Sequence, residues 1–256
     1  MQHNPASRRA RLAGHLFMLA FLAAWMAYSS VVDSYVMPGP WAVAQRLVQM
    51  FGDVHEVKHM LYSFAHIIAA VAISFVIGSA LAFLAHYLSI TAHAVHGRLN
   101  PFLNSFSGIG WTFLAIIWFG ISDVTVVFVI SMVLIPFAII NMREGLGNID
   151  GERLEMAASF SRSGWRRFSL IVLPSLLPFI FATIRISFGV AWKVALTAEL
   201  FGGNTGLGYL LNLARQDFDM PLVLGVIIII VAFVYSTDRF IFAPVQSVLA
   251  RHHGAN

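Results

Sequence analysis

The feature that most constrains this chain is a series of six apolar segments, each about long enough to cross a lipid bilayer. They lie at 13–32, 63–85, 101–120, 124–142, 174–198 and 221–247. A spanning helix needs roughly 20 predominantly apolar residues. Backbone groups in lipid must pair internally, so segments of this kind form helices. The sequence therefore predicts an all-α, polytopic membrane protein with about six transmembrane helices.

The composition supports lipid as the natural solvent of this chain. Hydrophobic residues make up 59% of it and charged residues only 11%, whereas a soluble domain carries roughly a quarter charged residues. The basic residues lie in short clusters between apolar segments, which indicates membrane topology and excludes nucleic acid as a partner. The chain has no cysteine, which excludes disulfides and thiolate metal sites.

The positions of lysine and arginine predict the orientation. With a cytoplasmic N-terminus, eleven basic residues fall on the inner side and three on the outer side. The inner residues are Arg8, Arg9, Arg11, Arg98, Arg143, Arg153, Arg162, Arg166, Arg167, Arg239 and Arg251. The outer residues are Arg46, Lys58 and Arg215. Because basic residues favour the cytoplasmic side, we expect both termini to be cytoplasmic.

One membrane domain accounts for nearly all of the chain. We expect a cytoplasmic segment at 1–12, a single transmembrane domain at 13–250 with a cytoplasmic loop at about 143–173, and a short tail at 251–256. The first apolar segment resembles a signal peptide but is about long enough to span, so we interpret it as a retained helix. Apolar residues at helical spacing over 41–51 predict a surface helix at the membrane face.

The link at 143–173 is the most informative segment. It is charged, cytoplasmic in the predicted topology, and long for a connection in a compact bundle, where such links usually carry function. Apolar residues in its middle, Leu154, Ala157, Ala158 and Phe160, indicate a short helix with an apolar face. Such a face is a docking surface for another protein.

This link resembles the cytoplasmic signature of the membrane permease subunits of binding-protein-dependent ABC importers. That signature is E-A-A, three residues, G, nine residues, then I-x-L-P. The residues that match at the right spacing are Glu155, Ala157, Ile171, Leu173 and Pro174. Met156 replaces the first alanine, Ser161 stands where the glycine is expected, and Gly164 follows three residues later.

The resemblance extends over about 36–250. The pattern Ala191-Trp192-Lys193, followed by Ala198-Glu199 and Gly206-Leu207-Gly208, is similar to the branch of this family that handles nitrate, sulfonates and taurine. The stretch Ser107-Gly108-Ile109-Gly110-Trp111 of the third apolar segment lacks the prolines expected there in that branch. The resemblance implies a bacterial inner-membrane subunit that forms the path for a small solute, such as one of these anions.

The resemblance also implies partners. In this family the cytoplasmic link inserts into a groove on a separate ATPase, so we expect an ATP-binding subunit dimer and a second permease chain, giving a homodimer. An extracytoplasmic solute-binding protein completes the complex. The chain lacks the pattern G-x-x-x-x-G-K-[ST] that cradles ATP phosphates. We therefore expect no enzyme activity and no cofactor in this chain, with ATP and Mg bound by the ATPase.

Two basic residues inside the fifth segment are candidates for the translocation path. Arg185 lies near mid-bilayer, where insertion scales put the cost of arginine at roughly 2.5–3.5 kcal/mol, so it must face protein or a wet cavity. Either it favours anions in the path, or it pairs with backbone carbonyls or a neighbouring helix. Lys193 lies nearer the outer edge, where it either lines the path or extends to the interface.

Two other functions remain open on sequence grounds. A secondary transporter couples ions through intramembrane carboxylates, and no carboxylate lies near the midplane of the predicted spans. A zinc metalloenzyme is suggested by His55, Glu56 and His59, which match H-E-x-x-H. No third ligand stands out, so we interpret these three as polar residues of an outer loop and expect no metal site.

Overall fold

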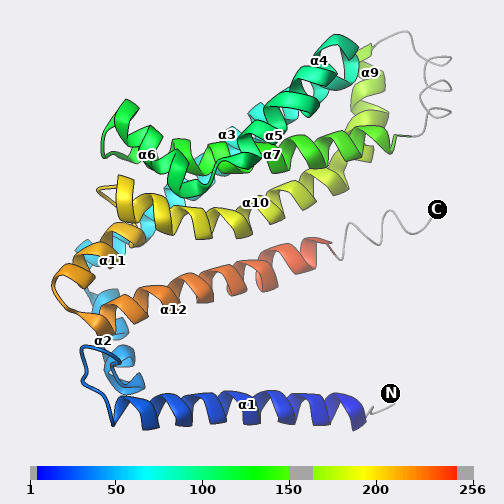
Figure 1. Ribbon diagram of the computed structural model, residues 1–256. Coiled ribbons are helices and arrows are strands. Elements are labelled where there is room, and N and C mark those ends of the chain that lie inside the picture. Colours follow the sequence, from blue (N-terminus) through cyan, green and yellow to red (C-terminus); the bar gives the residue numbers. More distant parts are fainter. Residues whose placement is uncertain (1–4, 150–163, 247–256) are drawn as a thin grey trace. The chain divides into compact units, whose positions relative to one another are not determined.

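The computed structural model describes residues 5–149 and 164–246. Throughout these residues the regular elements are helices, which confirms the predicted all-α fold (Figure 1). The chain divides into two compact units. The first combines Met1–Val57 with Leu211–Ile229, and the second combines Lys58–Leu210 with Ile230–Asn256.

The first unit contains helices α1 (Pro5–Ser29) and α2 (Pro40–Gly52). The predicted surface helix over 41–51 is confirmed as α2. Proline at its first turn fits there because that position needs no N–H donor. The indole N–H of Trp25 donates to the carbonyl of Pro38 at 3.0 Å, which ties α1 to the segment before α2.

Arg46 on α2 organises the polar contacts of the first unit. Its guanidinium donates to both carboxylate oxygens of Glu56, at 2.5 and 3.0 Å, and to Asp219 at 2.8 Å. Hydrogen bonding to Glu56 raises the pKa of Arg46 above its ordinary value. Asp219 also accepts from the N–H of Leu222, so it caps the start of α12 (Met220–Thr237).

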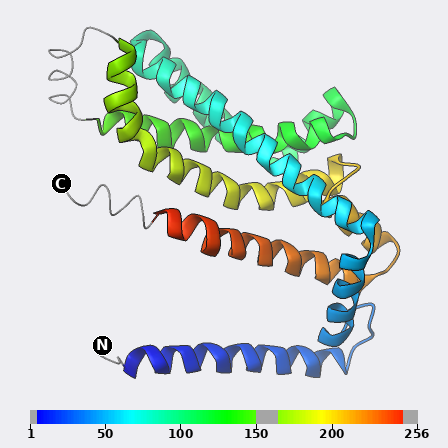
Figure 2. The ribbon, with the colours of Figure 1, turned by 180° about the vertical axis from the view of Figure 1, so that it is seen from behind.

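The second unit is built on three long helices, α3 (Val54–Tyr87), α7 (Asp123–Gly147) and α10 (Leu173–Gly202). In both views α7 and α10 lie side by side and α3 crosses them (Figures 1 and 2). Small residues allow α3 and α7 to approach each other closely. A Cβ on Gly78 of α3 would lie 2.5 Å from the Cβ of Ala138 on α7.

The segment predicted as one span over 101–120 is instead a broken pair of helices. Residues 89–105 contain α4 (Ser89–Ala94), a π-helical turn and α5 (Asn100–Ser105), and α6 (Gly108–Phe119) follows at an angle of 89°. The hydroxyl of Ser107 accepts from the N–H of Gly110, which starts a new helix rather than continuing the old one.

Each π-helical turn of the described chain ends two residues before a proline. The turns are Val95–Leu99, Phe168–Val172 and Asp238–Phe242, and the prolines are Pro101, Pro174 and Pro244. Proline has no N–H and its ring collides with the carbonyl four residues earlier. A wider turn relieves that collision without ending the helix.

Four helical stretches of the described residues are long and apolar enough to cross a membrane, or five if the broken pair counts as one. They include Val54–Tyr87, Asp123–Gly147, Gly164–Gly202 and Met220–Gln246. The first segment, predicted at 13–32, differs. It is helical up to Ser29, where α1 ends, rather than up to residue 32.

The close approach at Gly78 generates a test of packing. Gly78→Ala places a methyl group against Ala138 and only 2.9 Å from the carbonyl oxygen of Ile135, where backbone cannot yield easily. We expect a loss of about 1–3 kcal/mol, the usual effect of overpacking, and a lower Tm in detergent. The control is Gly147→Ala, because a Cβ there meets nothing within 4 Å. Equal Tm values for the two variants would contradict tight packing of α3 on α7.

Candidate functional site

A cavity of about 690 Å³ opens along one side of α10. Much of its wall is apolar, including Pro178, Ala182, Gly189 and Val234. Its polar groups are Arg185, Lys193, Asp238 and Gln246. A cavity with ionisable groups inside otherwise apolar helices is a place for a polar solute or for water, since lipid solvates neither charge.

Arg185 is paired across this cavity. Its Nε donates to one carboxylate oxygen of Asp238 at 2.8 Å, and a second guanidinium nitrogen donates to the other oxygen at 3.1 Å. The side chain of Gln246 accepts from the remaining terminal nitrogen. A two-point contact of this kind fixes the guanidinium in place. Of the two interpretations of Arg185, the structure supports pairing with a neighbouring helix.

Lys193 lies two turns further along α10 and faces the same cavity. Its side chain is exposed, and among residues 5–149 and 164–246 no carboxylate pairs with it. The charge of Arg185 is balanced by Asp238, whereas that of Lys193 is not. The two predicted path residues therefore share one cavity, and the positive charge that is open to a solute belongs to Lys193.

The signature residues are placed only in part. Glu155, Met156, Ala157 and Ser161 lie outside the described residues. Gly164 lies in α9 (Gly164–Arg167), Ile171 lies in the π-helical turn, and Leu173 and Pro174 begin α10. The signature thus leads directly into the helix that lines the cavity.

A hydrophobic cluster anchors this end of α10. Val172 and Leu176 pack with Ala82 of α3 and with Met142 and Leu146 of α7. Apolar side chains packed in this way move together, because a dense core transmits displacement rather than absorbing it. A force applied to the segment before α10 therefore reaches three long helices.

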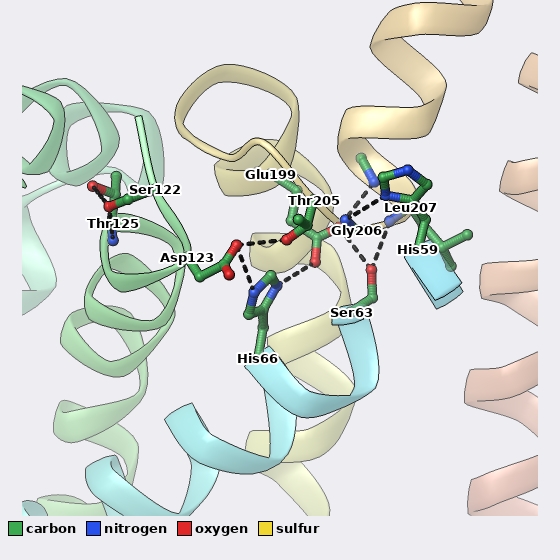
Figure 3. A network of polar contacts seen from close by, with 11 residues as sticks. His59, Ser63, His66, Ser122, Asp123, Thr125, Glu199, Thr205, Gly206 and Leu207 are labelled. Atoms are coloured by element: carbon green, nitrogen blue, oxygen red, sulfur yellow. Dashed lines mark hydrogen bonds and ion pairs between the residues drawn. The ribbon is translucent and has the colours of Figure 1, made fainter. Parts of the chain in front are cut away.

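At the opposite end of α10 a carboxylate is buried. Glu199 is only 1% exposed. Its Oε2 accepts from the hydroxyl of Ser63 at 2.8 Å and from the N–H of Gly208 at 2.9 Å, and its Oε1 lies 2.9 Å from Nδ1 of His66 (Figure 3). Three donors satisfy this carboxylate, as burial in apolar surroundings demands.

The network continues from His66 to the start of α7. Nε2 of His66 lies 3.4 Å from Oδ1 of Asp123, and the same oxygen accepts from the hydroxyl of Thr205 at 2.5 Å (Figure 3). Asp123 follows Ser122, whose hydroxyl caps α7. The network therefore joins α3, α7, α10 and the glycine-rich segment at 202–208.

Sequence reasoning missed the Glu199 network. In the sequence Glu199 stands out only as part of the pattern that resembles the family, and no partner is assigned to it. A signal was present, because Ser63 and His66 are polar residues in the same apolar run and His59 precedes them at helical spacing. Polar residues on one face of a spanning helix point to a shared polar partner.

The H-E-x-x-H residues have other contacts. Glu56 pairs with Arg46, and Nδ1 of His59 accepts from the N–H of Gly206 at 3.2 Å. In the described part of the chain no three histidine, aspartate or glutamate side chains gather to hold a metal ion. Nothing in these contacts supports a metalloenzyme.

The helices and the charged cavity define a multi-pass membrane protein with a polar site inside its spans. Residues 18–248 match the family of binding-protein-dependent transport system inner membrane components, and the chain belongs to that family. It is therefore the permease subunit of an ABC importer, located in the bacterial inner membrane, and members of its family work with an ATPase and a solute-binding protein.

Curated relatives agree with the predicted branch. The chain is 27% identical to a putative aliphatic sulfonates transport permease, SsuC of Bacillus subtilis, over 90% of this chain and 84% of that protein. It is 26% identical to the taurine transport system permease TauC of Escherichia coli, over 90% and 86%. A shorter match, 34% identical over 45% of this chain and 44% of that protein, is to the putative SsuC of Escherichia coli. The similarity to the sulfonate and taurine branch is confirmed.

The ion pair in the cavity predicts non-additive mutations. Arg185→Ala leaves Asp238 without its partner and Asp238→Ala leaves Arg185 without its own, so each change should lower the Tm of the protein in detergent. The double variant should be more stable than the sum of the two effects, with a coupling of about 0.5–1 kcal/mol for a partly exposed pair. Strictly additive effects would show that the pair contributes nothing.

Proposed function

We propose that this chain and a second copy of it form the translocation path for a small anion, and that the cavity beside α10 is part of that path. The observation that carries the proposal is the unbalanced charge of Lys193 in a cavity whose other cation, Arg185, is already paired. An unbalanced positive charge with low-dielectric walls attracts an anion and disfavours a cation.

Names of relatives point to the same chemical class. Aliphatic sulfonates carry a fixed negative charge, and the relatives that share about nine tenths of this chain are named for sulfonates and for taurine. A sulfonate is small enough for a cavity of about 690 Å³. The apolar wall at Pro178, Ala182 and Val234 suits the aliphatic part of such a molecule.

The chemical energy comes from outside this chain. We assign ATP and Mg to a separate cytoplasmic ATPase pair, because this sequence has no phosphate-binding loop. The segment at 143–173 is the docking element for that ATPase, with both termini on the same side of the membrane. A solute-binding protein delivers the anion at the opposite face.

Lys193 is the residue whose replacement tests the anion path. Lys193→Met removes the charge and keeps the length of the side chain, whereas Lys193→Arg keeps the charge. A hydrogen bond to a charged group contributes about 1.5–3 kcal/mol, so we expect the methionine variant to raise KM for sulfonate uptake by roughly tenfold or more.

Uptake is measured in proteoliposomes that contain the ATPase and a saturating amount of binding protein. The arginine variant should retain most of the uptake, and both variants should assemble equally. If Lys193→Met transports the sulfonate with the KM of the parent, Lys193 does not contact the anion.

The docking element has its own test. Ala157→Trp introduces bulk where the signature requires a small residue, at a cost of about 1–3 kcal/mol as in cores, and Glu155→Lys reverses a charge. Both changes should reduce recovery of the ATPase in a pull-down, or separate ATP hydrolysis from uptake, without lowering the amount of permease in the membrane. The control is Ser159→Ala in the same segment. Normal assembly and uptake in both variants would mean that the ATPase docks elsewhere.

A further inference from the structure

The polar groups of the cavity beside α10 fall into two sets. One is Lys193, and the other is Arg185 with its partners Asp238 and Gln246. Lys193 follows Arg185 by eight residues of α10, which is about 12 Å at 1.5 Å per residue. In the proposed orientation Lys193 is nearer the outer face and Arg185 nearer the inner one. An anion that enters at Lys193 therefore passes Arg185 before it leaves.

Arg185 is an anion-binding group whose place for an anion is already filled. Its guanidinium donates to both carboxylate oxygens of Asp238, at 2.8 and 3.1 Å, and its remaining terminal nitrogen donates to Gln246. A guanidinium offers the same pair of parallel N–H groups to any oxyanion with two oxygens side by side. Asp238 therefore occupies the position that an anionic solute would take at Arg185.

The contact between Arg185 and Asp238 is open to the cavity. The two side chains are 31% and 51% exposed. Water and ions weaken the attraction between partly exposed charges, and a charge released into a wet cavity is not left in lipid. Breaking this pair is therefore much less costly than breaking a buried one, and an anion in the cavity can compete with Asp238 for the guanidinium.

The backbone beside Asp238 is less regular than the backbone beside Arg185. Asp238 begins the π-helical turn Asp238–Phe242, and its carbonyl accepts from the N–H of Ala243, five residues later. Pro244 comes next and has no N–H to donate. Arg185 lies inside the long helix α10. Since π-helical turns interrupt the regular hydrogen-bond ladder, often at functional sites, Asp238 is the partner that is placed to withdraw.

We propose that Asp238 is an internal competitor for the transported anion. It pairs with Arg185 while the cavity is empty of solute, and it gives up the guanidinium when an anion arrives from Lys193. This inference rests on the proposed function and adds the step by which the anion leaves. Competition from Asp238 weakens the hold of Arg185 on the anion, so that the anion is passed on rather than retained.

The exchange at Arg185 also selects among anions. A sulfonate presents two oxygens to the guanidinium and so replaces both contacts that Asp238 gives up. A halide ion has no such pair of oxygens and replaces them poorly. Lys193 is a compact point charge that attracts either kind of anion. We therefore assign the preference for oxyanions over halides to Arg185 and its competitor.

Binding without ATP tests the competition directly. The probe is radiolabelled ethanesulfonate, and its Kd is measured on the assembled complex in nanodiscs. Asp238→Asn keeps the shape of the side chain and removes its charge, so we expect binding about tenfold tighter than in the parent, the usual effect of gaining a hydrogen bond to a charged group. Asp238→Ser supplies a second variant without the charge, in case the first does not assemble.

Two further variants show whether the gain belongs to Arg185. Adding Arg185→Gln to Asp238→Asn should remove the gain, whereas Asp217→Asn, an exposed carboxylate outside the cavity, should bind the probe as the parent does. Methanesulfonate should displace the probe from Asp238→Asn at much lower concentration than bromide. Unchanged or weaker binding in both charge-free variants would overturn the proposal, and so would a gain that persists with Arg185→Gln.

Uptake supplies a readout that a purely structural ion pair would not move in the same way. In proteoliposomes with ATP and binding protein, Asp238→Asn should lower both KM and kcat for ethanesulfonate, because the anion is held more tightly and released more slowly. Loss of a merely structural contact would lower kcat without lowering KM. A lower kcat with an unchanged or higher KM would therefore contradict the competition.

The same assays separate this proposal from the proposed function. If Asp238→Asn tightens binding through Arg185 but Lys193→Met leaves binding and KM unchanged, the competition stands and the role of Lys193 is wrong. If Lys193→Met weakens binding and Asp238→Asn has no effect, the anion path stands and Asp238 is only a structural partner. Absence of ethanesulfonate binding in every variant would overturn both.

Discussion

The scarcity of water inside the spans is the constraint on which this structure depends. A charge in that environment is tolerated only beside an opposite charge, a set of donors or a wet cavity. Glu199 is surrounded by three donors, and Arg185 is held by Asp238 and Gln246. Because these charged groups have partners, a charged group without a partner is a candidate for contact with a solute. In the described cavity that group is Lys193, and its charge is the basis of the proposed path for anions.

Helix α10 brings the functional regions of the chain onto one rigid element. Its first turn follows the segment that we propose as the docking element, its middle lines the cavity, and its last turns carry Glu199. With 30 residues at 1.5 Å each, it extends about 45 Å. If the ATPase docks at 143–173 as proposed, a displacement at that end can reach the cavity and the glycine-rich segment along a single helix. Packing at Leu176 against α7 carries the same displacement to a second helix.

Much of the helical organisation was predictable from the sequence, because the length of an apolar segment reflects the thickness of the bilayer. Helices α2, α3, α7 and α10 lie where periodicity and hydropathy predict them. The bend at Ser107 was not predicted, because a single hydroxyl that caps a helix leaves hydropathy unchanged. The π-helical turns before Pro101, Pro174 and Pro244 were missed for a similar reason. A proline indicates that the helix must deviate nearby, but whether the helix bends, widens or ends there depends on its packing.

The site was predictable only as a set of residues. Arg185 and Lys193 stood out as charges in an apolar run, but their different roles depend on Asp238, which is distant in sequence and meets Arg185 only in the fold. Glu199 becomes part of a buried polar network because Ser63 and His66, more than 130 residues away in the sequence, contact it in the fold. Pairings at such separation follow from tertiary structure, and neither periodicity nor a short motif contains them.

The central claim is that this chain is the membrane path of an ATP-driven importer of a small anion. Purified complex in proteoliposomes, supplied with its binding protein and a labelled aliphatic sulfonate, tests it most directly. Accumulation should require ATP on the ATPase side, should persist when proton and sodium gradients are collapsed, and should be absent for a cationic amine of the same size. Uptake that continues without ATP and follows an ion gradient would contradict the account and indicate a secondary transporter.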